Sequence, residues 1–231
     1  MSKIVVANWK MNPQTLKEAE ELFRISTGAI VCPPFVYLEE LSKIKSGAIL
    51  GAQDIAFSDE SGQTGEVSGE MLRQLGIKYV IIGHSERRWK LGESDETVNK
   101  KLKLALSYDF TPIVCIGEKM RDKNFKGFLE NQINSTFAGL DDQIEKCLIA
   151  YEPVWAISTN PGARPDTPEA TVESVNFIKG IANTKILYGG SIDSKNVADF
   201  ISLPEIDGVL VGGASVSKDE FKKIIEVSLN V

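Results

Sequence analysis

Short apolar runs alternate along the chain with longer stretches in which apolar residues recur every three or four positions. The short runs are rich in Val and Ile and contain few polar residues, which is typical of strands in a parallel sheet covered on both faces. Eight such runs predict strands, at Ile4–Ala7, Ala29–Cys32, Ile49–Ala52, Tyr79–Ile82, Thr111–Ile116, Cys147–Tyr151, Ile186–Tyr188 and Gly208–Val211.

The intervals between these runs have the spacing of amphipathic helices. Val98, Leu102 and Ala105, for example, fall on one face of a helix. The clearest stretches of this kind predict helices at Leu16–Arg24, Asp95–Tyr108 and Phe125–Phe137.

Two later helices have recognisable start signals. Thr167 can cap a helix whose first residue is Pro168, because proline needs no hydrogen-bond acceptor at that position. Ser217 and Glu220 have the spacing of a capping box, in which each side chain bonds to a backbone N–H near the other residue. We therefore predict that the last helix begins after Ser217.

The resulting order of about eight strand-then-helix units defines the fold class. Right-handed crossovers repeated eight times can close a parallel sheet on itself. We predict an α/β fold, a (β/α)8 TIM barrel of eight parallel strands with eight outer helices. No shift of composition marks a boundary, so we expect one domain over residues 1–231. A doubly wound open sheet is the alternative.

Composition and charge narrow the possible partners. The chain has 231 residues and a formal net charge of -6, which disfavours nucleic acid as a partner. The basic residues at 87–90 are flanked by acidic ones, which favours a salt-bridged helix start over a nucleic-acid patch. No apolar run approaches the length of a membrane span, and the N-terminus does not resemble a signal peptide. We expect a cytoplasmic protein that binds neither nucleic acid nor membrane.

The three cysteines, Cys32, Cys115 and Cys147, are widely spaced and form no metal-binding pattern. We interpret them as buried small hydrophobic residues in a reducing compartment. His84, the one histidine of the chain, and the scattered acidic residues also lack the spacing of metal ligands, so we expect no metal.

Candidate chemistry gathers where the predicted strands end, which is where barrel enzymes place their active sites. Five strand ends carry polar, charged or glycine-rich segments, namely Asn8 to Lys10, Gly83 to Glu86, Glu152 to Trp155, Gly189 to Ser191 and Gly212 to Ser215.

The two glycine-rich segments follow the last two strands. Glycine lets backbone N–H groups approach a phosphate closely, and barrel enzymes often bind phosphate after strands seven and eight. Gly-Gly pairs also occur in tight turns that bind nothing. Two adjacent pairs, each followed by serine, favour a phosphate site that includes Ser191, Gly212 and Gly213.

The acid–base candidates are His84 and Glu152, with Lys10 and Asn8 near them. Glu152 is either a salt-bridged structural residue or a general base, and a lone histidine is more often structural than catalytic. Lys10 is either a surface lysine or a counter-charge for an anion, and Asn8 either caps a turn or donates to an oxyanion. Together with a phosphate site, the set favours proton transfer beside a carbonyl on a small phosphorylated substrate.

Nine segments in this order resemble the triosephosphate isomerase family: "VANWKMN", "CPPF", "GAQD", "TGEVSGEML", "IIGHSERR", "PIVCIGE", "AYEPVWAI", "YGGS" and "DGVLVGGAS". The resemblance runs from Val5 to about Phe221, and "GHSERR" with "AYEPVWAI" is highly specific. It implies interconversion of dihydroxyacetone phosphate and D-glyceraldehyde 3-phosphate through an enediolate, without a cofactor, in glycolysis and gluconeogenesis.

The resemblance also implies roles for individual residues. Glu152 corresponds to the base that moves the proton, and His84 to the electrophile at the carbonyl oxygen. Lys10 and Asn8 correspond to stabilisers of charge. Glu86 is either a second acid–base group or the partner of Lys10. Ser191, Gly212 and Gly213 correspond to phosphate binders.

The family typically forms homodimers, in which the loop after the third strand reaches into the other subunit. In this chain that loop contains Thr64, which is expected to brace Asn8 and Lys10 across the interface. The resemblance further implies that Glu66 and Arg87 form an ion pair that supports the catalytic loop.

The resemblance breaks in the segment that follows Ile157. The chain is about three residues longer here than the family pattern and reads "STNPGARPD" before Thr167. Ser158 stands where a glycine N–H of the family meets the phosphate. We expect the Ser158 N–H to take this role, with the Gly162 N–H as the alternative donor.

Two other functions remain open on these residues. A different phosphosugar isomerase would share the phosphate site but would not need His84 and Glu152 in these contexts. A metabolite-binding barrel without activity is compatible with the altered segment after Ile157, although the set of Asn8, Lys10, His84 and Glu152 argues against it.

Overall fold

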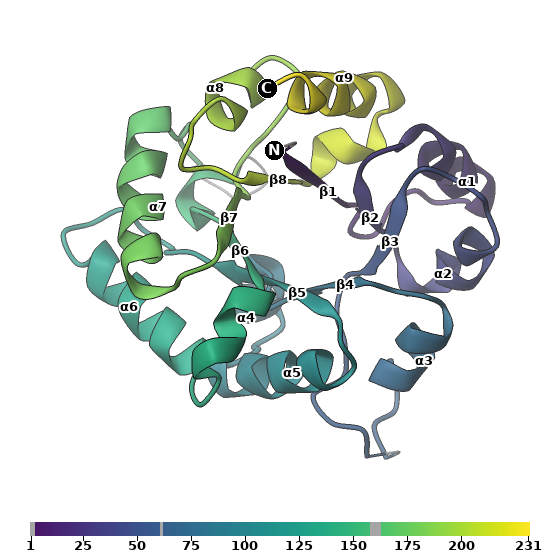
Figure 1. Ribbon diagram of the computed structural model, residues 1–231, viewed down its shortest axis with the longest axis horizontal. Helices are drawn as coiled ribbons and strands as arrows, with labels where there is room; N and C mark the ends of the chain where they lie inside the picture. Colours follow the sequence, from purple (N-terminus) through teal and green to yellow (C-terminus); the bar gives the residue numbers. More distant parts are fainter. Residues whose placement is uncertain (1–2, 61, 158–162) are drawn as a thin grey trace.

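The chain forms a closed barrel of eight parallel strands, described from a computed structural model that covers residues 3–60, 62–157 and 163–231 (Figure 1). Neighbouring strands pair in sequence order, and the first strand also pairs with the last, with Val6 opposite Leu210. Because this pairing closes the sheet, the prediction of a barrel is confirmed and the open-sheet alternative is wrong.

The strands follow the predicted apolar runs to within one residue at each end. They are β1 (Ile4–Asn8), β2 (Ile30–Cys32), β3 (Ile49–Ala52), β4 (Tyr79–Ile82), β5 (Thr111–Ile116), β6 (Leu148–Tyr151), β7 (Lys185–Tyr188) and β8 (Gly208–Val211).

The helices surround the barrel. In the described residues they are α1 (Leu16–Ile25), α2 (Phe35–Ser42), α3 (Gly69–Gln74), α4 (Ser85–Lys90), α5 (Asp95–Ser107), α6 (Phe125–Thr136), α7 (Pro168–Ile181), α8 (Val197–Ile201) and α9 (Lys218–Leu229), with short 3-10 helices η1 (Asp141–Lys146), η2 (Val154–Ala156) and η3 (Gly213–Val216). The interval after β4 thus contains two helices where the periodicity predicted one, because the turn around Gly92, with φ of 77°, separates α4 from α5.

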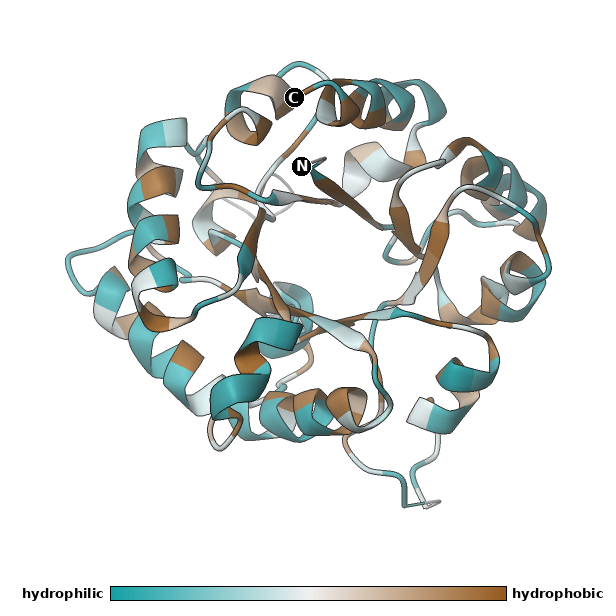
Figure 2. Ribbon diagram, viewed as in Figure 1, coloured by the Kyte–Doolittle hydropathy of each residue, from teal (hydrophilic) through white to brown (hydrophobic). Residues whose placement is uncertain are grey.

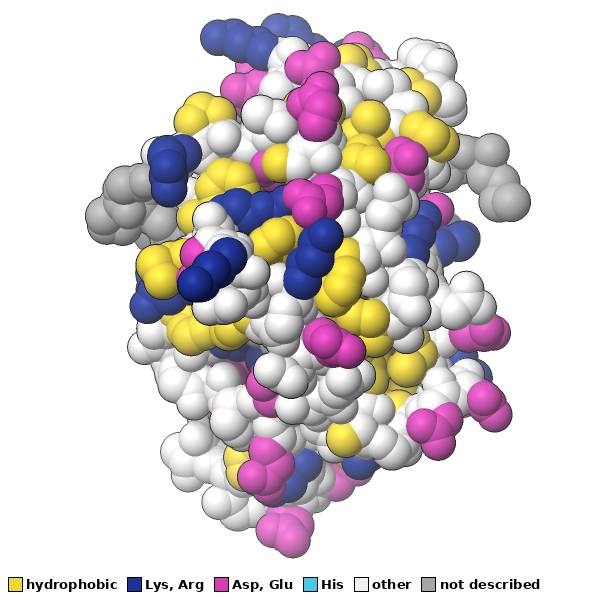
Figure 3. All heavy atoms as spheres, turned by 90° about the vertical axis from the view of Figure 1, so that its left-hand side faces the viewer, with side chains coloured by type: hydrophobic (Ala, Val, Ile, Leu, Met, Phe, Trp, Pro, Cys, Tyr) yellow, Lys and Arg dark blue, Asp and Glu magenta, His cyan; other side chains and the backbone are white. Residues whose placement is uncertain are grey.

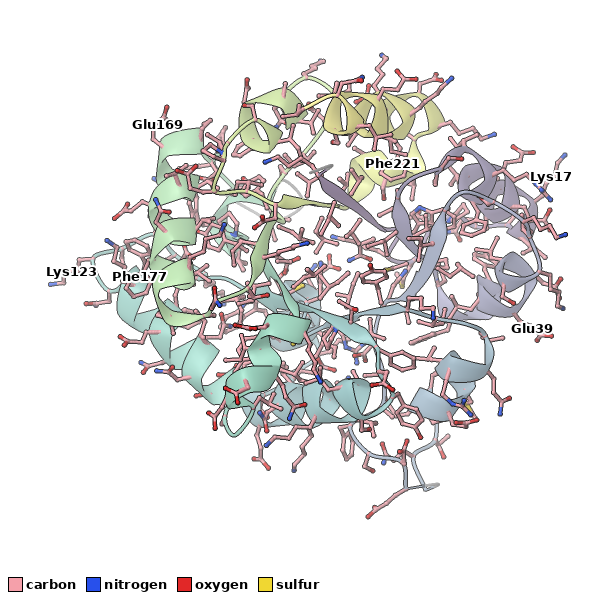
Figure 4. The ribbon with its side chains drawn as sticks, in the orientation of Figure 1. Lys17, Glu39, Lys123, Glu169, Phe177 and Phe221 are labelled. Carbon is pink, nitrogen blue, oxygen red and sulfur yellow. The ribbon has the colours of Figure 1, made fainter. Side chains whose placement is uncertain are left out.

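The apolar side chains form two layers, as alternation along each strand requires. One layer fills the barrel interior and includes Val6, Ile81 and Ile113. The other lies between the strands and the helices, which turn their apolar faces toward the barrel (Figure 2). Phe221 lies in this outer layer, between α9 and the strands (Figure 4). All three cysteines are buried and unpaired, as predicted.

One predicted helix cap is confirmed, whereas for the other the start of α9 after Ser217 is confirmed and the capping-box hydrogen bonds are wrong. The Thr167 hydroxyl accepts a hydrogen bond from the Ala170 N–H at the start of α7. The Ser217 side chain makes no capping bond in α9. The Glu220 carboxylate accepts instead from the Ser194 N–H, at 3.0 Å. The Ser194 N–H, from a neighbouring loop, therefore takes the place of the Ser217 N–H that a capping box would use.

The surface carries charges of both signs. Basic and acidic side chains lie interspersed on the face shown in Figure 3. The segment between β3 and α3 extends away from the barrel (Figure 1). In the described residues, no helix combines the length and the apolar character needed to cross a membrane.

Candidate active site

A cavity of about 290 Å³ lies at the carboxyl ends of the strands. It brings together seven predicted site residues from five separate parts of the chain, namely Asn8, Lys10, His84, Glu152, Ser191, Gly212 and Gly213. Five further residues line the cavity that the sequence did not single out. Ile157, Ile192 and Leu210 form an apolar part of its wall, and Asp193 and Asn196 are polar.

His84 enters the cavity from the end of β4. The chain turns sharply after this strand, since Gly83 has a φ of 67°. His84 then occupies the N-cap position of α4, where its side chain accepts a hydrogen bond from a backbone N–H of the first turn. The imidazole is thus held at a helix start and is only 7% exposed.

The hydrogen bonds of His84 identify which ring nitrogen carries the proton. The Glu86 N–H donates to Nδ1 at 3.2 Å. An Nδ1 that accepts this hydrogen bond corresponds to a ring whose proton is on Nε2. Nε2 lies 3.1 Å from Oε1 of Glu152, within hydrogen-bond distance. An imidazole nitrogen therefore faces a carboxylate inside the cavity.

Glu152 follows β6 and is almost completely buried. Its Oε2 accepts a hydrogen bond from the Ser85 N–H at 2.9 Å. Burial alone would raise the pKa of this carboxyl, but His84, the Ser85 N–H and the charge of Lys10 outweigh it and hold the pKa below its ordinary value. The carboxylate is therefore ionised at neutral pH.

Two glycines make room for Glu152. A Cβ atom on Gly117 would lie 1.8 Å from the backbone oxygen of Glu152, and one on Gly189 would lie 2.9 Å from its Cγ. Both glycines directly follow strands that neighbour β6 in the barrel. Close packing of bare backbone on both sides therefore fixes the carboxylate in place.

Lys10 reaches the cavity through a backbone conformation that is rare for a residue with a side chain. Its φ is 55°, and its N–H donates to Oδ1 of Asn8 at 3.1 Å. The Gln53 amide group donates to the Lys10 carbonyl at 2.8 Å, which holds the turn from the neighbouring loop. Such strain is found where a functional geometry is imposed.

The ammonium group of Lys10 lies 3.1 Å from Oε1 of Glu86. Of the two interpretations of Glu86, the geometry matches that of a partner of Lys10. Burial would raise the pKa of Glu86, but the charge of Lys10 next to it holds the pKa below its ordinary value.

The glycine-rich segments after β7 and β8 form the other end of the cavity. The Ser191 hydroxyl donates to the Ala156 carbonyl at 3.1 Å, and the Asn196 amide donates to the Ser191 carbonyl at 2.9 Å. Gly212 lies against the Lys10 side chain, whose Cε would be 3.5 Å from an added Cβ. Ser158 and Gly162, the two predicted N–H donors to the phosphate in the segment after Ile157, lie outside the described residues.

Comparison with known proteins agrees with this geometry. A family model described as triosephosphate isomerase matches residues 3–228. The triosephosphate isomerase of Aquifex aeolicus is 40% identical over 249 aligned positions, which cover 97% of this chain and 99% of that protein. The enzyme of Endomicrobium trichonymphae is 41% identical, over 97% of this chain and 98% of that protein.

The chain belongs to the triosephosphate isomerase family. The resemblance predicted from nine short segments is thereby confirmed, and so is the prediction of an isomerase.

A residue that sequence reasoning missed in this family member is Glu118. It follows β5 and is 1% exposed, and its carboxylate accepts hydrogen bonds from Tyr151 at 3.0 Å and from the Trp155 indole at 2.8 Å. Burial raises its pKa above the ordinary value. Its place at a strand end, in the quoted segment "PIVCIGE", was the signal that could have identified it.

The predicted interface residues do not form their predicted ion pair within the described chain, although the charge of Glu66 helps to raise the pKa of Arg87. Thr64 and Glu66 are exposed on the extended segment after β3. The predicted ion pair between Glu66 and Arg87 is not formed within the described chain. Arg87 instead pairs with Asp54 at 2.8 Å and with Glu93 at 2.7 Å, because both carboxylates are buried against it.

The described residues contain no cluster of three or more His, Cys, Asp or Glu side chains placed to hold a metal ion. Arg88 pairs with Asp95 at the start of α5, so the basic stretch at 87–90 is salt-bridged as predicted, although it lies in the last turn of α4 and not at a helix start.

Proposed function

We propose that this chain interconverts dihydroxyacetone phosphate and D-glyceraldehyde 3-phosphate. The observation that carries the proposal is the hydrogen bond between His84 and Glu152, a neutral donor and an ionised base, in a cavity that ends in a glycine-rich segment. An isomerase of this kind needs both groups beside two adjacent carbons, and a site for the phosphate at a fixed distance from them.

In this mechanism Glu152 removes a proton from the carbon next to the carbonyl and returns it to the other carbon. The intermediate between the two steps is an enediolate. The lowered pKa of Glu152 keeps the base ionised, and the apolar wall of Ile157, Ile192 and Leu210 excludes water from the intermediate.

His84 donates from Nε2 to the carbonyl oxygen as negative charge develops there. Neutral histidine in this position is a known feature of triosephosphate isomerases. In the unliganded chain the same N–H donates to Glu152, so substrate binding exchanges this hydrogen bond for one to the substrate. Substrate binding thus frees the His84 N–H for the carbonyl oxygen and the Glu152 carboxylate for the proton at the same time.

Lys10 and Asn8 stabilise the negative charge of the intermediate. Asn8 is 5% exposed, and its Oδ1 is already used by the Lys10 N–H, so its amide N–H group is the donor left for an oxyanion. Glu86 acts as the partner that holds the Lys10 ammonium group between catalytic events, and it has no separate acid–base role in this mechanism.

The phosphate binds to backbone N–H groups of Ser191, Gly212 and Gly213. Glycine backbone lets an anion approach closely, and Lys10 beside Gly212 contributes the positive charge. The fourth donor of this proposal, Ser158 with Gly162 as the alternative, belongs to the segment outside the described residues.

The proposed working form is a cytoplasmic homodimer. Thr64 of one copy would brace Asn8 and Lys10 of the other, and Glu66 of one copy would pair with Arg87 of the other. The exposure of Thr64 and Glu66, and the lack of a Glu66–Arg87 pair within the described chain, support a pairing between copies. Sedimentation analysis tests the dimer.

A direct test of the activity uses glyceraldehyde 3-phosphate and the purified protein in heavy water. Proton abstraction by Glu152 predicts that part of the dihydroxyacetone phosphate formed gains deuterium at the carbon that receives the proton, because the proton on Glu152 exchanges with solvent in a fraction of turnovers before it is returned. Absence of turnover at micromolar protein would refute the proposal. Deuterium gain in any fraction of the product excludes direct hydride transfer between the two carbons.

A further inference from the structure

Behind the glycine-rich segment lies a second cavity of about 330 Å³. Ser191 and Asn196 line both this cavity and the active-site cavity. The segment that would bind phosphate is therefore a thin wall with open space on both sides. A wall of this kind keeps its shape only where particular side chains support it.

The support under Gly190 is the side chain of Tyr188. A Cβ added to Gly190 would lie 2.2 Å from the Tyr188 hydroxyl oxygen, so the bare backbone rests on this group. The faces of the ring are held by stacking on Phe200 of α8, with centroids 4.2 Å apart and planes at 4°. The position of Gly190 therefore depends on where the Tyr188 hydroxyl is held.

The Tyr188 hydroxyl donates to Oδ2 of Asp166 at 3.3 Å. The same oxygen accepts a hydrogen bond from the Thr171 hydroxyl at 2.7 Å, and Oδ1 accepts from the Thr167 N–H at 2.8 Å. Asp166 thus links the start of α7 to the end of β7. Asp166 lies in the segment "STNPGARPD", in which this chain departs from the family pattern.

Helix capping does not account for these contacts. Thr167 already caps α7 through the Ala170 N–H. A half-buried carboxylate is also unfavourable, since desolvation raises the pKa of Asp166 above its ordinary value despite three hydrogen-bond donors. A residue that only had to end a loop would not need this charge or the bond to Tyr188.

We propose that Asp166 is a positioning residue for phosphate binding, which acts through the Tyr188 hydroxyl on Gly190 and Ser191. The proposal rests on the proposed function, because it concerns the phosphate end of that same site. Loss of Asp166 leaves His84 and Glu152 unchanged and lets the glycine-rich segment move. Its effect falls on phosphate affinity and not on the proton transfer itself.

The test compares four variants with the wild type: Asp166→Ala, Asp166→Asn, Tyr188→Phe and the double variant Asp166→Ala with Tyr188→Phe. The measured quantities are the Kd for inorganic phosphate by titration calorimetry, and KM and kcat for glyceraldehyde 3-phosphate. Isomerisation of D-glyceraldehyde, which lacks the phosphate, is measured in parallel. Glu169→Ala is the matched control, because Glu169 is exposed in the first turn of the same helix and points away from the barrel (Figure 4).

We expect Asp166→Ala and Tyr188→Phe each to raise the Kd for phosphate and the KM about tenfold, the size of one lost hydrogen bond to a charged group. The double variant is no weaker than either single variant, because both remove the same link. Asp166→Asn keeps an acceptor oxygen for Tyr188 and retains most of the affinity. The kcat, the reaction of D-glyceraldehyde and the Glu169→Ala control stay near wild type.

The proposal is overturned if both single variants bind phosphate as tightly as the wild type. It is also overturned if the rise in Kd of the double variant equals the product of the rises in the two single variants. A parallel loss with D-glyceraldehyde also overturns it, since this indicates general damage to the barrel. If Asp166→Ala does not fold, Tyr188→Phe, which removes one hydroxyl, decides the question alone. A wild type that binds phosphate but does not isomerise refutes the proposed function only, and the phosphate titrations still test Asp166.

Discussion

Two groups of buried and half-buried ionisable residues lie at α4, and they differ in what surrounds them. The cavity cluster consists of Lys10, His84, Glu86 and Glu152. All of these except Glu86 line the active-site cavity, and Glu86 joins the cluster through its ion pair with Lys10. The sealed cluster consists of Asp54, Arg87, Glu93 and Lys101. Its Lys101 and Asp54 side chains are 2% and 6% exposed, and none of its members lines that cavity.

The partners of the two key carboxylates explain the difference. Asp54 contacts two cations, Lys101 at 2.6 Å and Arg87 at 2.8 Å, yet burial raises its pKa to about 6. Glu152 is bonded to the His84 imidazole and a backbone N–H, which hold its pKa below the ordinary value against the effect of burial. A donor at an open cavity can be exchanged for substrate, whereas a sealed ion pair cannot. Burial of charge alone therefore does not mark a reactive group.

The largest expected effect is on the sealed cluster. Lys101→Met leaves two buried carboxylates with one cation and should lower the free energy of unfolding by about 3–5 kcal/mol, measured by urea denaturation. The kcat of the folded protein should stay within a few fold of wild type. Lys100→Met is the control, because the Lys100 side chain is 54% exposed and its ion pair with Glu96 lies at the surface, so a loss below about 1 kcal/mol is expected. Equal losses in both variants would contradict the comparison.

The reverse pattern is expected for Glu152→Asp in the cavity cluster. Shortening the side chain withdraws the carboxylate by about 1 Å, and a displacement of that size can lower kcat on the order of 100-fold. The melting temperature should change little, because the charge and the cavity remain. Steady-state kinetics and thermal melts of the same preparation check both statements. Wild-type turnover in this variant would show that Glu152 is not the base.

A smaller effect separates the two carboxylates by pH. Carbon-13 NMR titration should show Glu152 ionising below its ordinary pKa and Asp54 near 6. Because the folded-state pKa of Asp54 is raised, its protonation stabilises the fold at low pH, and this contribution is lost as pH rises from about 4 through 6. Glu152 has the opposite sign, since its contribution is present above its unfolded pKa and lost as pH falls. If Glu152 and Asp54 both titrated at the ordinary pKa values of their side chains, the two clusters would not differ in this respect.

The smallest change to measure is the position of one proton. Nitrogen-15 NMR of the single histidine at neutral pH should give the signals of a neutral ring protonated on Nε2, as required by the Glu86 N–H that donates to Nδ1. Both ring nitrogens protonated would mean that His84 and Glu152 form an ion pair. The cavity cluster would then resemble the sealed one.

The sequence by itself determined the fold and the inventory of the site. Continuous apolar runs and helical patterns placed strands such as Thr111–Ile116, and parallel topology then put Asn8, Lys10, His84 and Glu152 at one end of the barrel. These features are local, since each depends on residues within a few positions of one another. The resemblance of short segments supplied the chemistry.

The tertiary structure alone decided how the side chains pair. The His84–Glu152 bond joins residues 68 positions apart by number, and Arg87, Glu118 and Asp166 each have a partner from another strand–helix unit. The predicted capping-box hydrogen bonds at Ser217 are absent for the same reason, because the Glu220 carboxylate accepts from the Ser194 N–H of a neighbouring loop. Local pattern fixes which groups a segment offers, but burial forces each polar group to find a partner, and packing between distant segments selects which one it is.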